Sequence, residues 1–200
     1  MTNNTLIQIG CSDGNDHVFE FLKSSKEAYN VVLVDAFLPA LKVAEERYKT
    51  LNKHSIKFLN KAVLDNEDEF VDFFHQDDGQ IHGSNSVSEQ FLMVHGVAKD
   101  LIKKERVEAI NINTLLKENT NSKIEYLFID AESLDCSLIN NLKLEQFDIS
   151  NIIFEWAHSE GARTGENTGT FRETQDKLEK AGYNLHIHES DAWNIIASKN

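Results

Sequence analysis

Short apolar runs alternate along the chain with segments in which apolar residues recur every three or four positions. The runs are rich in β-branched residues, as in strands buried on both faces, and the other segments have the spacing of amphipathic helices. This alternation predicts parallel strands joined by helices, and therefore an α/β fold. Strands are expected at 6–9, 30–36, 56–63, 107–112, 124–132 and 151–156, and helices at 16–26, 39–51, 113–117, 138–144 and 171–181.

Two parts of the chain depart from this rhythm. The runs at 183–188 and 192–198 are separated by a short turn, which predicts an antiparallel hairpin at the end of the chain. Residues 64–106 have no clean period, although 69–75 could add a strand. A structureless loop of that length is unusual in a compact domain, so we interpret the segment as an insertion. The prediction is one doubly wound, mostly parallel α/β domain over residues 1–200.

Composition and charge narrow the choice of partners. The formal net charge is −13, which disfavours nucleic acid and anionic membrane surfaces. Apolar stretches are too short to span a membrane, and no basic segment precedes one as in an export signal. Cys11 and Cys136 suggest reduced thiols in the cytoplasm. Small molecules, neutral glycans or proteins are the expected partners, and the oligomeric state stays open.

The first predicted strand ends in a glycine-bearing turn, from Gly10 through Ser12 to Gly14, directly before the first helix. Glycines there let the backbone turn sharply and let a ligand approach closely, although such a turn can also bind nothing. Asp35 ends the second strand about 20 residues later, where dinucleotide-binding folds place a ribose-binding acid. Because the two features support each other, we favour a ribose-binding role for Asp35 over a helix cap.

The glycine spacing separates two classes of cofactor. Dinucleotide-binding turns follow G-x-G-x-x-G, in which the backbone meets a pyrophosphate. The turn at 10–14 lacks the third glycine and has no basic residue. S-adenosylmethionine carries no phosphate, so a neutral to acidic turn suits it better. A nucleotide-dependent oxidoreductase is the less favoured alternative.

Further chemical groups stand where later strands end, which is where open α/β sheets bind their ligands. A carboxylate there could act as general base for an acceptor hydroxyl, and neighbouring carboxylates could raise one pKa. Helix capping is the alternative for Glu132. The same groups could hold a divalent metal, but spacing alone does not establish a site, and a metal is not favoured. These candidates are Asp130, Glu132, Glu155 and His158.

With these motifs, the chain resembles the FkbM-type S-adenosylmethionine-dependent methyltransferases. The resemblance runs from about residue 6 to 197, and its most specific block is DAESLD at 130–135, similar to the D-V-E-G-x-E of the family. It implies a class I methyltransferase fold with a seven-stranded sheet, and methylation of hydroxyl oxygens, often on sugars or polyketides. The other matching motifs are IQIGCSDG, VVLVDAF, LNKAVLDNEDE, VEAININTLL, NIIFEWAH and LEKAGY.

The resemblance also implies a role for each matching position. The methionine part of the cofactor would lie against Gly10, Ser12 and Gly14, and the ribose against Asp35. The adenine would lie between Ala62, Val63 and Asp65, whereas Asp130 and Glu132 would face the sulfonium and the acceptor.

Three positions depart from the family pattern. Gln8 stands where the family usually has an acid for the amino group of the cofactor, Phe128 replaces a polar residue, and Ser133 replaces a glycine. A weakly active or inactive binding protein of the same fold is therefore the second alternative. The segments 64–106 and 157–168 are expected to cover the acceptor.

Overall fold

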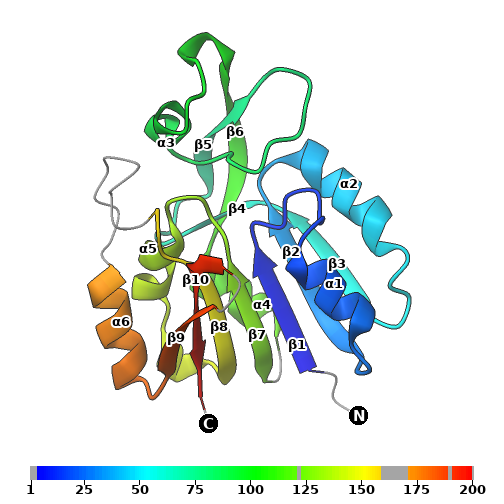
Figure 1. Cartoon of the computed structure of the whole chain (residues 1–200), viewed down its shortest axis with the longest axis vertical. Coiled ribbons are helices and arrows are strands. Elements are labelled where there is room, and N and C mark those ends of the chain that lie inside the picture. The colour runs from blue at the N-terminus through cyan, green and yellow to red at the C-terminus, as the bar shows by residue number, and fades with distance from the viewer. Residues whose placement is uncertain (1–3, 121–122, 159–170, 189–190, 200) are drawn as a thin grey trace.

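The computed structural model describes residues 4–120, 123–158, 171–188 and 191–199, and its main sheet has seven strands in these ranges (Figure 1). The strand order is β3-β2-β1-β7-β8-β10-β9. The first five strands in this order run parallel, whereas β10 runs antiparallel to both β8 and β9. The predicted mostly parallel sheet with an antiparallel hairpin is confirmed. The strands are β1 (Asn4–Ile9), β2 (Tyr29–Asp35), β3 (Ser55–Asn60), β7 (Ile124–Ile129), β8 (Ile149–Glu155), β9 (Asn184–His188) and β10 (Asp191–Ser198).

Helices cover both faces of this sheet because successive strand residues point to opposite sides. In β1, Leu6 packs into one apolar cluster with residues of α1 and α2. Its neighbour Ile7 packs into a second cluster with residues of α4, α5 and α6. The two clusters form the core and hold the strand ends in fixed positions. The helices are α1 (His17–Ser24), α2 (Leu38–Tyr48), α4 (Ile112–Asn119), α5 (Asp135–Asn141) and α6 (Phe171–Lys180), with a 3₁₀ turn η2 (Leu144–Gln146).

A second, three-stranded sheet lies beyond the carboxyl ends of β1 and β2, at the top of Figure 1. It contains β4 (Ala62–Leu64), β6 (Ile102–Asn111) and β5 (Phe70–Gln76), in that order. β4 is parallel to β6, and β5 is antiparallel to it. The helix α3 (Glu89–Val94) and the 3₁₀ turn η1 (Lys99–Leu101) connect β5 to β6. The segment at 64–106 is thus ordered structure beside the strand ends.

Two predicted elements differ most from the structure. The single strand expected at 56–63 is wrong, because β3 ends at Asn60 and β4 begins in the other sheet. The Asn60 amide donates to the carbonyls of Asp35 and Ala36, and Lys61 N–H also donates to the Asp35 carbonyl, which fixes this break. β6 begins at Ile102, before the predicted 107, because its first half is exposed and charged and lacks an apolar signal.

The described residues include no helix that is both long and apolar enough to cross a membrane. Both cysteines are buried. Cys11 lies in the turn after β1 and Cys136 in α5, each inside an apolar cluster. They therefore contribute to the packing of the core on opposite faces of the sheet.

Candidate active site

The turn after β1 depends on glycine at two positions. Gly10 has φ +77°, and a Cβ there would lie 1.7 Å from the backbone oxygen of Asp130. Only glycine therefore lets the ends of β1 and β7 approach this closely. Gly14 has φ +70°, and a Cβ there would lie 2.7 Å from the ring of Tyr48. Gly14 thus brings the turn against α2, whereas Gly10 brings it against the end of β7.

Asp35 connects this turn to the end of β2. One carboxylate oxygen accepts a hydrogen bond from Ser12 N–H at 2.7 Å, and the other accepts one from Phe37 N–H at 2.8 Å. Burial raises the pKa of Asp35 to about 6, although these backbone donors favour the charged form. Asp35, which the sequence analysis associated with the Gly10–Gly14 turn, is therefore hydrogen-bonded directly to that turn.

A cavity lies between the strand ends and the second sheet. From the main sheet it is lined by Gly10, Ser12, Asp35, Asp130 and Glu132, and from β4 by Ala62 and Val63. The segment after β5 adds a wall whose individual residues the sequence did not indicate, because this stretch has no regular period. That wall consists of His82, Gly83, Asn85, Ser86 and Val87.

Three predicted cofactor-binding residues are not among those that line this cavity, and neither are Glu155 and His158. Gln8 is buried, and its amide donates to a carboxylate oxygen of Asp16 at 2.7 Å. Asp16 caps the start of α1, so Gln8 helps to fix that helix. Asp65 accepts a hydrogen bond from the hydroxyl of Ser137 in α5. Gly14 packs against α2 as described above.

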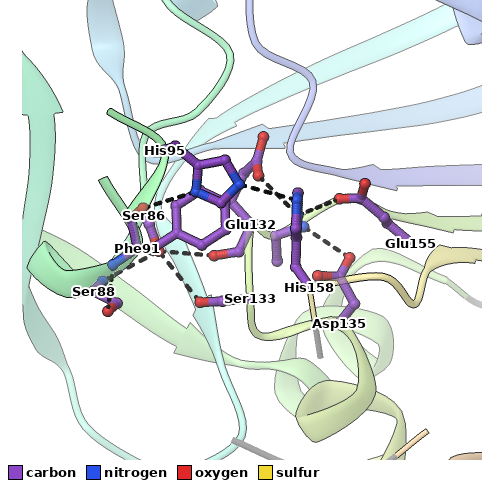
Figure 2. A network of polar contacts seen from close by, with 10 residues as sticks. Ser86, Ser88, Phe91, His95, Glu132, Ser133, Asp135, Glu155 and His158 are labelled. Carbon is purple, nitrogen blue, oxygen red and sulfur yellow. Dashed lines mark hydrogen bonds and ion pairs between the residues drawn. The ribbon is translucent and has the colours of Figure 1, made fainter. Parts of the chain in front are cut away.

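A polar network borders the cavity at Glu132 (Figure 2). His158 Nδ1 lies 2.8 Å from a carboxylate oxygen of Glu155 and 3.5 Å from one of Glu132. Its Nε2 lies 3.2 Å from Nε2 of His95, which follows α3. Burial alone would lower the pKa of His158, but the Glu132 and Glu155 carboxylates outweigh it and raise this pKa to about 9.

The sequence did not indicate His95 or Asp135 as members of this network. His95 Nδ1 lies 2.8 Å from the carbonyl oxygen of Phe91. Asp135, at the start of α5, is fully buried and accepts a hydrogen bond from Ala131 N–H at 3.0 Å. Burial raises the pKa of Asp135 to about 8, and the nearby charges of Glu155 and Glu132 act in the same direction.

The backbone between Asp130 and Asp135 is strained. Glu132 has φ +48° and Ser133 has φ +97°, in the left-handed region that side chains other than glycine seldom adopt. The Ser86 hydroxyl donates to the carbonyl of Glu132 at 2.8 Å. The backbone N–H groups of Ser86 and of Phe74 in β5 each donate a hydrogen bond to the carbonyl oxygen of the other residue. The second sheet therefore holds this turn in place.

The model of the Methyltransferase FkbM domain family matches residues 4–185. The chain belongs to this family. The match covers the ends of the parallel strands, the turn and the polar network described above. It confirms the family to which the motifs at 6–197 pointed. No curated protein matches the FkbM domain described here significantly.

Solved structures resemble this FkbM domain at low sequence identity. The methyltransferase FkbM of Methylobacillus flagellatus KT is 10% identical with a TM-score of 0.50, covering 98% of this chain and 43% of that one. The Streptococcus mutans protein SMU.1697c, solved in complex with SAH, is 11% identical with a TM-score of 0.49, covering 100% and 90%. The ribosomal protein L11 methylase of Lactobacillus delbrueckii is 10% identical with a TM-score of 0.45, covering 100% and 72%. The first of these similarities shows a shared fold.

Proposed function

We propose that this FkbM domain transfers a methyl group from S-adenosylmethionine to a hydroxyl oxygen of a small acceptor, such as a sugar or glycan. The observation that carries the proposal is the direct bond between Asp35 and the Gly10–Gly14 turn at the wall of the cavity. A ligand with a ribose and a polar tail can contact both groups at once. The cavity also opens onto Asp130 and Glu132, where an acceptor would lie.

The charges around the cavity favour a cationic cofactor. Its lining includes the carboxylates of Asp35, Asp130 and Glu132. The one lysine in that lining, Lys61, forms an ion pair with Glu108 at 2.9 Å. A pyrophosphate would be repelled by these acids, whereas a sulfonium would be attracted. The site therefore suits S-adenosylmethionine better than a dinucleotide.

Each part of the cofactor has proposed contacts. The ribose hydroxyls would donate to Asp35, whose oxygens each keep a lone pair beyond their backbone bonds. The adenine would lie against Ala62 and Val63, and the methionine part against Gly10 and Ser12. Gln8, Gly14 and Asp65 would act from outside the cavity, by fixing α1, α2 and α5 around it.

When bound, S-adenosylmethionine would supply an electrophilic methyl group on its sulfonium. The protein has to align the acceptor hydroxyl with that methyl group and to remove the hydroxyl proton. We assign proton removal to a carboxylate oxygen of Asp130 or Glu132, because both line the cavity. Glu155 and His158 lie behind Glu132 and would position it. The neighbouring carboxylates raise the pKa of His158 to about 9, which favours a protonated ring, so we assign His158 this positioning role and not that of the base.

The second sheet and its loops are proposed to select the acceptor. His82, Asn85 and Ser86 line the cavity opposite the strand ends, so the insertion at about 64–106 would contact the acceptor within one methyltransferase domain over 1–200. Most of the segment 157–168, also expected at this place, lies outside the described residues. The net charge of −13 favours a neutral acceptor over nucleic acid. Buried thiols at Cys11 and Cys136 suit a cytoplasmic enzyme.

Calorimetric titration with S-adenosylmethionine and with NAD tests the cofactor. We expect S-adenosylmethionine to bind and Asp35→Asn to weaken it, because hydrogen bonds to a charged group contribute about 1.5–3 kcal/mol, or roughly 10- to 150-fold in Kd. Asp72→Asn is the control, since Asp72 lies on β5 and pairs with the exposed Lys104. Binding of NAD alone, or an unchanged Kd in Asp35→Asn, would contradict the assignment.

A binding protein without methyl transfer is the second candidate. Gln8 favours it, because this amide replaces a charged group and is engaged with Asp16. A transfer assay with isotope-labelled S-adenosylmethionine and a panel of hydroxylated acceptors separates the two. Label transfer that is lost in Asp130→Asn supports the enzyme, whereas tight cofactor binding without transfer to any acceptor supports the binding protein.

A further inference from the structure

Three side chains beside the cavity converge on one point. Glu132 follows β7, Glu155 ends β8, and His158 follows β8. One potential ligand atom from each lies within 4.8 Å of the other two. Figure 2 shows both carboxylates and the imidazole pointing toward one another. This is the spacing at which three protein ligands surround a single cation.

Hydrogen bonds on the far side of His158 direct Nδ1 toward that point. A carbonyl oxygen can only accept, so His95 Nδ1 must donate to Phe91 at 2.8 Å. The neutral His95 ring then offers Nε2 as an acceptor, and His158 Nε2–H donates to it at 3.2 Å. This leaves Nδ1 of His158 facing Glu132 and Glu155. Metal-bound histidines are commonly oriented in this way by a bond from their second nitrogen.

Asp135 is an independent sign that positive charge is missing here. It is fully buried, and its Oδ2 has no hydrogen-bond partner within the described part of the chain. Its carboxylate points toward His158 and Glu155 in Figure 2. Within the described ranges, His158 is the basic side chain in ion-pair range of Glu132 and Glu155. Asp135, Glu132 and Glu155 are thus three neighbouring, largely buried carboxyl groups, and a cation here would offset the cost of burying their negative charge.

We propose that Glu132, Glu155 and His158 bind a divalent first-row transition metal ion, with Asp135 behind them compensating its charge. Two carboxylates and one imidazole suit Mn²⁺, Fe²⁺ or Zn²⁺, whereas Mg²⁺ and Ca²⁺ prefer oxygen ligands alone. Glu132 also lines the cavity, so the ion would lie at the edge of the space for the acceptor. The proposal concerns metal binding and stands whether or not the chain transfers methyl groups.

Titration of the chelator-treated protein with MnCl₂ tests this site, followed by calorimetry and by loss of the electron paramagnetic resonance signal of free Mn²⁺. We expect one Mn²⁺ per chain and a rise in Tm of the unaltered protein. Glu155→Gln and His158→Gln should each weaken binding about tenfold or more, and His95→Ala should weaken it by removing the orienting bond.

His82→Gln is the matched control. His82 and Asp78 form another carboxylate–imidazole pair, at 2.8 Å, outside this network. This variant should bind Mn²⁺ like the unaltered protein. The proposal is wrong if neither Mn²⁺ nor Zn²⁺ binds or shifts Tm, or if binding survives in Glu155→Gln and His158→Gln. Because S-adenosylmethionine is absent from this titration, its result is separate from that of the cofactor experiment.

Discussion

At the scale of single residues, Ser133 carries a cost that a glycine would remove. A residue with a side chain at φ +97° lowers the free energy of unfolding by about 1–3 kcal/mol through backbone strain. Glycine avoids this strain but lowers the free energy of unfolding by about 0.5–1 kcal/mol, because its backbone has more conformational freedom to lose on folding. The contact between the Ser133 and Ser86 hydroxyls is long, at 3.4 Å, and contributes little. We therefore expect Ser133→Gly to stabilise the protein by about 1 kcal/mol, raising Tm by about 2–4 °C in a thermal denaturation experiment.

The control for this prediction is a serine with ordinary backbone geometry. Ser198 lies in β10 and is not among the residues with positive φ. Ser198→Gly should lower Tm, because glycine in a strand brings the entropic cost without relief of strain. Equal effects of both substitutions would show that the turn at Ser133 is not strained.

At the scale of elements, α3 depends on tertiary contacts. It has six residues, which is too short for a helix to be stable alone. Phe91 is fully buried, and its ring lies 4.1 Å from that of His95 and 5.0 Å from that of His158. We expect Phe91→Ala to destabilise α3 by about 3–5 kcal/mol, the usual cost of deleting a buried aromatic ring.

Hydrogen exchange measures this loss locally. The amides of His95, Gly96 and Val97 are bonded to carbonyls of α3 and should lose protection in Phe91→Ala. Amides in β1 and β7 should keep theirs, because their pairing does not involve α3. Phe70→Ala is the control, since Phe70 on β5 is 46% exposed and its loss should cost less than about 1 kcal/mol. Uniform loss of protection in all strands would show that α3 is not a separate unit.

The elements that the sequence predicted well are those buried on both faces. β1, β2 and β7 have mostly apolar sequences, because both faces of the main sheet are covered by helices. β6 was predicted only from residue 107, because most of its earlier residues are exposed and charged and give no apolar pattern. The break at Lys61 was missed because the apolar pattern continues from β3 into β4 while the chain changes sheets.

At the scale of the whole molecule, the site combines two kinds of residue. Those at the strand ends could be located from the sequence, whereas the residues that contact them from other segments could not. Acids at the ends of parallel strands could be placed together, since all such ends meet at one edge. His95 reaches the same edge only through the folding of residues 64–106, where no period gave a position. Asp135 ends the DAESLD block, but its full burial depends on the packing of α5 against the sheet.

Asp35 should make the stability of the whole fold depend on pH. Its pKa is about 6 when folded, against about 3.9 in the unfolded chain. Between these values the unfolded chain has lost a proton that the folded protein keeps, so the free energy of unfolding falls as pH rises from about 4 to about 6. Two pKa units correspond to about 3 kcal/mol.

Asparagine at position 35 removes this titration while keeping the shape of the side chain. Other groups titrate alike in both proteins, so their contributions cancel when the two free energies of unfolding are subtracted. Urea unfolding at several pH values should therefore show Asp35→Asn gaining about 3 kcal/mol relative to the unaltered protein between pH 4 and pH 7. A difference that stays constant with pH would mean that Asp35 is charged throughout this range. The backbone donors at Ser12 and Phe37 would then outweigh its burial.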